Sequence, residues 1–428
     1  MIKICNISEM SLEDIFPRRQ LATDVSAAVS GIIAEVRARG DEALREYTLR
    51  FDGVRLDRLE LSEAERREAL RSVESEFMEV LGEAARNIRA YHGSQLHGGY
   101  QIAQKPGVIL GQKLTPLASV GLYIPGGTAS YPSSVLMNCI PAVLAGVTEI
   151  VMTTPPGKDG RVDPNIIAAA ELAGVGRIFK CGGAQAVAAL AYGTDSLPRV
   201  DKIVGPGNVY VAEAKRQVFG VVGIDMLAGP SEVLVIADGK SDPVVLAADL
   251  LAQAEHDEMA RAVLITDDAV LAGQAAREIE TQLLRLPRQE IARAAIENNG
   301  RIIVADSIEQ AIALSNEIAP EHLELCVDEP FDYLGRILNA GAIFLGRNCP
   351  EPLGDYFAGT NHTLPTGGTA RFSSALSVAD FVKRSSYIYY SAQALDAVGD
   401  KIAYFADQEG LHAHAVSATI RSGRRGRE

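Results

Sequence analysis

A regular alternation of short strand-like runs with alanine-rich stretches begins near residue 118 and constrains the fold more than any other feature. The runs are rich in β-branched residues and too short for helices, whereas the stretches between them have helical length. This alternation predicts parallel sheets covered by helices. The expected strands are Val120–Ile124, Ile150–Thr154, Arg177–Cys181, Lys202–Val204, Val233–Ala237, Ala262–Thr266, Arg301–Ala305, His322–Val327 and Ala342–Leu345.

The helices expected between these strands form two series, one on each side of residue 232. Two series predict two Rossmann-like α/β domains in tandem. The expected helices are Ser133–Ala145, Pro164–Ala173, Ala184–Tyr192, Val209–Phe219, Pro243–Glu255, Asp268–Leu284, Ile308–Ile318 and Pro330–Ile337.

Both ends of the chain differ from this pattern. The N-terminal region is expected to be helical, with Asp24 as a helix N-cap and with Ser62 and Glu65 as a capping box. Beyond Phe372 the pattern becomes irregular, with a tyrosine-rich segment at 386–391 and a helix near 396–409. We expect this last part to be an extended C-terminal tail.

Charge and cysteine content exclude several classes of protein. The 428 residues carry a formal net charge of −14, which disfavours a nucleic-acid binder. The five cysteines are scattered without a C-x-x-C pair, which argues against a disulfide framework or a thiolate zinc site. The N-terminus lacks a signal-peptide pattern, and no apolar run approaches the roughly 20 residues that span a bilayer. We therefore expect a cytoplasmic protein that binds neither nucleic acid nor membrane.

Two pairs of polar residues could carry chemistry. Gln253 and His256 are three residues apart at the end of an expected helix, so they share a face and could meet one ion. Glu321 and His322 enter an expected strand after Pro320 and could form an acid–base couple. In each case an ordinary surface or half-buried pair is the alternative.

Two further segments add possible ligands. The glycine- and proline-rich loop from 350 to 368 carries Asp355 and His362, and a loop of this length costs chain entropy unless it has a function. Near the C-terminus, Glu409 precedes a His-x-His sequence that ends at His414, which by itself is read as a surface turn. A set of Gln, His, Asp and His ligands suits zinc, and also manganese or cobalt.

Three turns of the first α/β series could bind a nucleotide. Tyr123 ends one strand, Gln185 follows Gly182-Gly183 after another, and Asn208 follows Gly205-Pro206-Gly207 after a third. Ligands in open α/β sheets bind beyond the carboxyl ends of strands. The dinucleotide fingerprint is absent, so the alternative is ordinary tight turns.

The stretch from Ile224 to Asp238 (IDMLAGPSEVLVIAD) and its continuation from Asp249 to His256 (DLLAQAEH) resemble the signature of the histidinol dehydrogenase family. The resemblance covers nearly the whole chain, from Arg39-Gly40-Asp41 and the 51–54 turn to Glu409 and His414. It implies a zinc- and NAD-dependent dehydrogenase that oxidises L-histidinol through L-histidinal to L-histidine, the last steps of histidine biosynthesis.

The resemblance also implies residue roles. One Zn²⁺ per subunit would be held by Gln253, His256, Asp355 and His414, and Glu321 and His322 would be catalytic. The NAD contacts would be Tyr123, Gln185 and Asn208. The substrate contacts would be Ser231, Gln253, His256, His322, Asp355, His362, Glu409 and His414.

The family likeness further implies a domain-swapped homodimer in which His414 and Glu409 complete the other subunit's site. The expected boundaries are an N-terminal arm at 1–20, a first α/β domain at 21–121 and 233–376 with the metal ligands and the Glu-His pair, a second α/β domain at 122–232 that binds NAD, and a dimerisation tail at 377–428.

Three alternatives remain: a paralogous zinc- and NAD-dependent small-diol dehydrogenase, a metal-dependent hydrolase in which Glu321 activates water and no nucleotide binds, and a catalytically inert, metal-stabilised binding protein.

Overall fold

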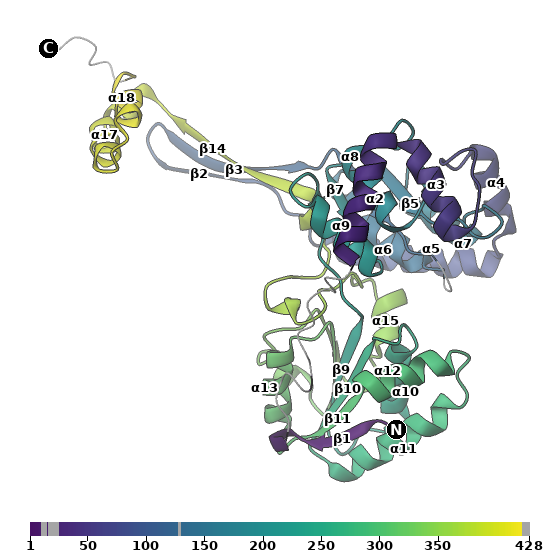
Figure 1. The fold of residues 1–428 in the computed structure, drawn as a ribbon. Coiled ribbons are helices and arrows are strands. Elements are labelled where there is room, and N and C mark those ends of the chain that lie inside the picture. Colours follow the sequence, from purple (N-terminus) through teal and green to yellow (C-terminus); the bar gives the residue numbers. More distant parts are fainter. Residues whose placement is uncertain (10–14, 16–24, 127–129, 422–428) are drawn as a thin grey trace. The chain divides into compact units, whose positions relative to one another are not determined.

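The computed structural model describes residues 1–9, 15, 25–126 and 130–421. The chain divides into two compact units, the first made of Met1–Gln95 and Leu117–Phe381 and the second of Leu96–Pro116 and Val382–Glu428. Both parallel sheets belong to the first unit (Figure 1). The prediction of an α/β protein with two parallel, Rossmann-like sheets is therefore confirmed.

One sheet has five parallel strands in the order β6-β5-β4-β7-β8. The central strand β4 is buried at every residue, as expected for a sheet covered on both faces. Its strands are β4 (Ser119–Tyr123), β5 (Glu149–Thr154), β6 (Arg177–Lys180), β7 (Lys202–Val204) and β8 (Gly223–Ile224). Its connecting helices are α6 (Pro132–Ala145), α7 (Pro164–Ala173), α8 (Gly183–Tyr192) and α9 (Val209–Val218).

Within residues 25–118, four α-helices precede this sheet: α2 (Ser26–Arg39), α3 (Asp41–Asp52), α4 (Glu63–Ser72) and α5 (Ser75–Gly93). Helices α2 and α3 bury Val29 and Leu44 in one core with α8 and the five-stranded sheet. The capping box of α4 is confirmed, because Ser62 Oγ accepts the N–H of Glu65 and Glu65 accepts the N–H of Ser62. The expected cap Asp24 lies outside the described residues. The domain boundaries inferred from the sequence stay a prediction.

The other sheet has six parallel strands in the order β1-β11-β10-β9-β12-β13. Its strands are β1 (Lys3–Asn6), β9 (Glu232–Ala237), β10 (Arg261–Thr266), β11 (Arg301–Val304), β12 (His322–Cys326) and β13 (Ala342–Leu345). Its helices are α10 (Pro243–Ala254), α11 (Ala269–Leu283), α12 (Gln289–Asn299), α13 (Ile308–Ile318), α14 (Phe331–Leu334) and α15 (Glu351–Tyr356). The register pairs His322 with Val233, so β9 and β12 begin side by side.

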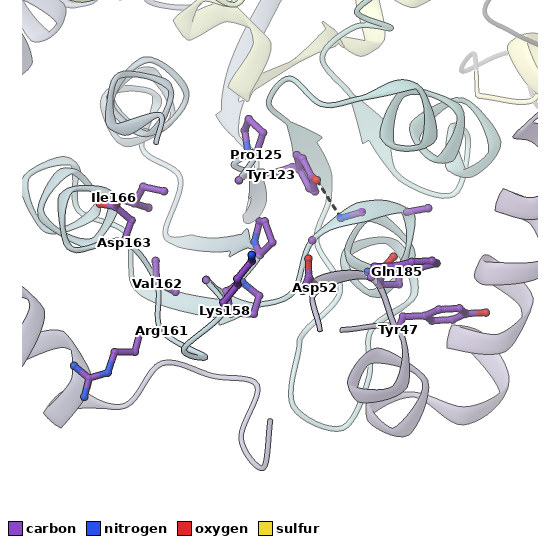
Figure 2. A pocket seen from close by; sticks show the side chains of 18 of the residues that line it. Tyr47, Asp52, Tyr123, Pro125, Lys158, Arg161, Val162, Asp163, Ile166 and Gln185 are labelled. Carbon is purple, nitrogen blue, oxygen red and sulfur yellow. Dashed lines mark hydrogen bonds between the residues drawn. The ribbon is translucent and has the colours of Figure 1, made fainter. Parts of the chain in front are cut away.

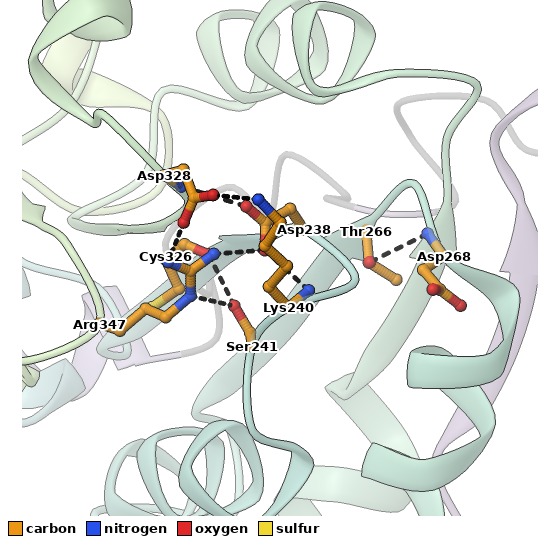
Figure 3. A network of polar contacts seen from close by, with 8 residues as sticks. All are labelled: Asp238, Lys240, Ser241, Thr266, Asp268, Cys326, Asp328 and Arg347. Atoms are coloured by element: carbon orange, nitrogen blue, oxygen red, sulfur yellow. Dashed lines mark hydrogen bonds and ion pairs between the residues drawn. The ribbon is translucent and has the colours of Figure 1, made fainter.

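The carboxyl ends of β9 and β12 are joined by ion pairs (Figure 3). Arg347 bridges Asp238 and Asp328, and Lys240 also pairs with Asp328. Ser241 Oγ donates to the carbonyl of Cys326 at 2.7 Å. Open α/β sheets usually bind ligands at this edge. In this sheet the charged groups at that edge pair with one another, which leaves the amino ends of the strands as the better candidate for a functional site.

The second unit is an antiparallel sheet followed by short helices. Strand β3 (Val108–Pro116) lies between β2 (Tyr100–Lys105) and β14 (Val382–Tyr390), and α16 (Ala392–Asp396), α17 (Gly399–Gln408) and α18 (His412–Thr419) follow. The tyrosine-rich segment is thus a strand, and the helix expected at 396–409 begins three residues later. Across all described helices, none has the length and apolar character to cross a bilayer.

Candidate functional site

His322 is the first residue of β12 and is buried at the amino edge of the six-stranded sheet. Its Nδ1 lies 3.1 Å from the carbonyl oxygen of Glu232. Because a carbonyl can only accept, Nδ1 carries the proton and Nε2 carries the lone pair. Nε2 is buried without a hydrogen-bond partner among the described residues. The backbone thus holds the imidazole in the tautomer that a general base requires.

Glu321 precedes this histidine and is equally buried. One carboxylate oxygen accepts the backbone N–H of Glu232 at 2.9 Å and lies 3.8 Å from His322 Nδ1. Burial raises the pKa of Glu321 to about 8, and burial likewise raises the pKa of the neighbouring Glu232 to about 7. The Glu-His couple expected from the sequence is therefore a buried and oriented pair.

Three side chains next to His322 form a possible metal site. His256, Glu351 and Asp355 each offer a ligand atom, and these atoms lie within 4.8 Å of one another. His256 follows the end of α10, while Glu351 and Asp355 are four residues apart on α15 and share a face. When its amide nitrogen faces Glu351, Gln253 donates to both carboxylate oxygens, at 3.0 and 3.3 Å.

The electrostatics of this group fit a divalent cation. Burial raises the pKa of Glu351 to about 7 and lowers the pKa of His256. Burial alone would raise the pKa of Asp355, but the nearby histidines hold it below its ordinary value. Burial would also lower the pKa of His322, yet Glu351 and Glu321 raise it. Crowded carboxylates beside an uncharged imidazole are a donor set that zinc satisfies.

Glu351 was missed in the sequence analysis. Its spacing of four residues from Asp355 is the signal that could have found it, but the segment reads as a loop because of Pro350, Pro352 and Gly354. The N–H of Glu351 donates to Glu324 at 2.7 Å, so a second buried carboxyl group holds the start of α15.

The other residues expected to contact the substrate are divided between the two units, with His362 and Ser231 in the first. His362 is engaged at both ring nitrogens, by the carbonyl oxygen of Asp355 at 3.1 Å and by Ser134 Oγ at 3.2 Å. Ser231 immediately precedes β9, at the same sheet edge as His322. Glu409, at the end of α17, and His414, in α18, belong to the second unit.

A pocket of about 1740 Å³ brings together all three residues expected to contact NAD (Figure 2). Tyr123, Gln185 and Asn208 line it together with residues of α2 and α3. Tyr123 Oη accepts the N–H of Gly183 at 3.0 Å at the start of α8, and the side chain of Asn208 caps α9. The volume exceeds the roughly 300–1,000 Å³ of ordinary small-ligand sites, which leaves room for an extended dinucleotide.

The third of these turns is held by a buried ion pair. Lys215 Nζ pairs with Asp225 and donates to the carbonyl of Gly205 at 3.0 Å, while Asp225 accepts the N–H of Gly205 at 2.8 Å. Gly205 has a φ of 118°, and a Cβ there would lie 2.0 Å from the carbonyl oxygen of Tyr123. Only glycine fits, so the turn that presents Asn208 is built to approach β4 closely.

A second pocket of about 380 Å³ reaches the metal-site histidine. It is lined by His256, Arg288 and Tyr356 on one side and by Leu81 and Leu136 on another. Ser130 lines both this pocket and the larger one. The small pocket thus leads from the end of the nucleotide-sized pocket to the possible metal site.

A parallel α/β fold with a dinucleotide-sized pocket, a cluster of metal ligands and a buried Glu-His couple defines a metal-assisted, nucleotide-dependent oxidoreductase. A sequence profile described as histidinol dehydrogenase matches residues 17–422. The chain therefore belongs to the histidinol dehydrogenase family, whose members are NAD-dependent oxidoreductases and use zinc.

Individual relatives agree with this assignment. The chain is 57% identical over 394 residues to the histidinol dehydrogenase of Geobacillus kaustophilus (strain HTA426), covering 92% of this chain and 93% of the relative. It is 53% identical over 398 residues to that of Clostridium acetobutylicum, covering 93% and 92%. The crystal structure of histidinol dehydrogenase from Elizabethkingia anophelis superposes with a TM-score of 0.93 at 39% identity, covering 98% of each chain.

Proposed function

We propose that this chain oxidises L-histidinol through L-histidinal to L-histidine with two molecules of NAD. The observation that carries the proposal is the buried Nε2 of His322, which has no hydrogen-bond partner among the described residues and lies 3.8 Å from Asp355 Oδ1, next to the His256, Glu351 and Asp355 group. A base with a fixed tautomer and a vacant lone pair is what removal of a hydroxyl proton requires. Family membership supplies the substrate class.

His322 takes the hydroxyl proton at Nε2 in each oxidation. Its Nδ1–H stays on the Glu232 carbonyl at 3.1 Å, so the ring keeps its orientation while Nε2 changes protonation. When bound, NAD would accept the hydride and zinc would orient the substrate. Gln253, His256, Asp355 and His414 would hold the zinc, and Gln253 donates to the carboxylate of Glu351 when its amide nitrogen faces it.

Glu321 acts in the second oxidation. Its carboxylate is fixed by the N–H of Glu232 at 2.9 Å and stands beside the imidazole. It takes a proton from water as the water oxygen adds to the aldehyde carbon, and His322 returns the proton of the first oxidation to the former carbonyl oxygen, which yields the hydrate. His322 then removes a proton from a hydroxyl of that hydrate, and the hydride of the carbon would pass to the second NAD.

The proposal extends to the assembly. Glu409 and His414 belong to the second unit, whose strands expose Tyr100, Ile388 and Tyr389. Exposed apolar strands of this kind favour burial against another chain. We place the enzyme in the cytoplasm as a homodimer, with Glu409 and His414 donated to the partner's site. Ser231, His362 and Glu409 would contact the substrate.

Cofactor stoichiometry tests the proposed reaction. The full chain loaded with Zn²⁺, given excess NAD and limiting L-histidinol, is expected to form two NADH per histidinol, measured by NADH absorbance. A hydrolase or an inert binding protein would form none with metal in place, and either result would overturn the proposal. Oxidation of a sulfonated diol in preference to histidinol would favour the small-diol dehydrogenase.

The role of Glu321 predicts a difference between the two oxidations. Glu321→Gln should slow oxidation of L-histidinal by about a hundredfold or more, the range of general-base catalysis. Oxidation of L-histidinol to the aldehyde should change much less, because His322 serves that step alone. The measurement is kcat with each substrate separately, and an equal loss with both would remove Glu321 from the water-activating role.

A further inference from the structure

Asp52 ends α3 in an unfavourable environment. A carboxylate at a helix C-terminus faces the negative end of the helix dipole, and the next residue, Gly53, turns the chain with a φ of 73°. Within the described part of the chain, Oδ2 of Asp52 is buried and has no hydrogen-bond partner. Burial raises the pKa of this carboxyl to about 6. An acid kept in such a position against its local preference indicates a functional role.

The unpartnered oxygen belongs to a residue of the large pocket. Asp52 and Gln185 line the same pocket and are drawn close together in Figure 2. Gln185 is only 2% exposed, and its Oε1 also lacks a partner among the residues that the structure describes. Buried acceptors are normally satisfied. Two acceptor oxygens without a protein partner in one pocket therefore suit a ligand that brings hydrogen-bond donors, and hydroxyl groups fit an acidic acceptor best.

The position of Asp52 along the pocket indicates which part of the dinucleotide it meets. Ser130 lines both pockets and marks the end that leads to His256. Residues of α2 and α3, which include Glu35 and Asp52, line only the large pocket. The reacting nicotinamide must lie at the Ser130 end, so the α3 wall borders the adenosine half.

The acid that follows the second strand here differs from the usual ribose-binding acid of a dinucleotide fold. That acid ordinarily follows the second strand of the sheet. In this chain β5 ends at Thr154 and is followed by Pro155, Pro156, Gly157 and Lys158. Lys158 lines the pocket, and its ammonium group would attract a phosphate. Asp159, the next residue, lines the pocket too, but it is exposed and its Oδ1 already accepts the N–H of Arg161 at 3.0 Å. A less exposed acid is therefore better placed to discriminate against a phosphorylated ribose.

We propose that Asp52 accepts a hydrogen bond from the 2′-hydroxyl of the adenosine ribose of NAD and thereby sets the preference for NAD over NADP. The 2′-phosphate of NADP would meet a carboxylate in a partly buried site, where like charges repel strongly. This assignment rests on the proposed function, in which NAD occupies the large pocket.

Direct binding of both nucleotides tests the assignment. The Kd values of NAD and NADP are measured by calorimetry on the zinc-loaded full chain and on its Asp52→Ala and Asp52→Asn variants. Asp52→Ala should weaken NAD about ten- to hundredfold, the value of a hydrogen bond to a charged group. Asp52→Asn keeps an acceptor, so it should weaken NAD less and tighten NADP. In turnover, KM for NAD should rise while kcat stays near wild type.

Three controls separate ribose binding by Asp52 from a structural role and from a general effect of charge. Glu46→Gln removes an exposed acid of the same helix that pairs with Arg39 and does not line the pocket, so neither Kd should change. Without nucleotide, Asp52→Asn should melt no lower than wild type, because the carboxylate it removes has an unpartnered oxygen. Adenosine 5′-phosphate should lose affinity in Asp52→Ala, whereas its 2′-deoxy analogue should not.

Two results would overturn the inference while leaving the proposed function intact. The first is an unchanged ratio of the NAD and NADP Kd values in both variants of a wild type that binds NAD. The second is a lower melting temperature together with equal loss of both nucleotides, which is a structural role. If the wild type binds neither nucleotide, the proposed function itself fails.

Discussion

His256→Ala is expected to lose bound zinc and histidinol oxidation together. The imidazole of His256 offers one of three candidate ligand atoms that lie within 4.8 Å of one another. In the proposed mechanism, Nε2 of the neighbouring His322 takes the substrate proton, so His322 does not replace His256 as a ligand. Loss of a group that only orients a metal ligand costs about ten- to a hundredfold in metal affinity or activity. Loss of a ligand should therefore lower kcat by at least about a hundredfold.

The measurement is metal content by elemental analysis beside NADH formation. His97→Ala is the matched control, because His97 is exposed and lies in the second unit, and it should keep full metal and full activity. Melting of both variants should show that the fold survives the substitution. A metal-free His256→Ala protein with wild-type turnover would contradict the assignment of His256 as a ligand.

The fold could be predicted from local patterns because each strand and helix carries its own signal. The run Val233–Ala237 is entirely apolar, and the structure buries it as β9 in the centre of a sheet. The Ser62 and Glu65 capping box is a contact between neighbours in sequence, so it too could be read directly. The helix expected at 330–337 shortens to four residues, Phe331–Leu334, and ends at Gly335.

The antiparallel sheet of the second unit could not be predicted in the same way. β14 pairs with β3, more than 250 positions away in sequence, with Val382 opposite Pro116 and Tyr390 opposite Val108. Nothing in the local sequence indicates such a partner. Strands β2 and β14, whose residues are almost all exposed, lack the apolar alternation of a half-buried sheet. Pairing between strands that are distant in sequence depends on which surfaces the rest of the packed chain leaves uncovered. A short window of sequence does not contain that information.

The candidate site also has one part that could be predicted from the sequence and one part that could not. Glu321 and His322 are adjacent, so a candidate couple could be named from the sequence, but its orientation depends on the backbone of Glu232 in the neighbouring strand. Glu351 and Asp52 were passed over because acidic residues are usually solvated. Burial of their carboxylate oxygens distinguishes them, and burial is a property of the packed molecule.

Co-expression of His256→Ala chains with His414→Ala chains is expected to restore activity that neither variant has alone. In the proposed swapped homodimer each site takes His256 from one chain and His414 from the other. A heterodimer then holds one site with both substitutions and one site with none. Purified through two different affinity tags, it should show about half of the wild-type activity per dimer.

A dimer in which His414 is not exchanged between chains would give a different activity for the heterodimer. If His414 served its own chain, both sites of the heterodimer would carry one substitution and the purified heterodimer would be inactive. His412→Ala in place of His414→Ala is the matched control, since His412 lies in the same helix α18 and its Nδ1 is 3.0 Å from Asp407. That variant should be active by itself. Recovery with the His414 pair therefore reports a ligand that crosses between chains, because no arrangement within one chain can produce an intact site from these two substitutions.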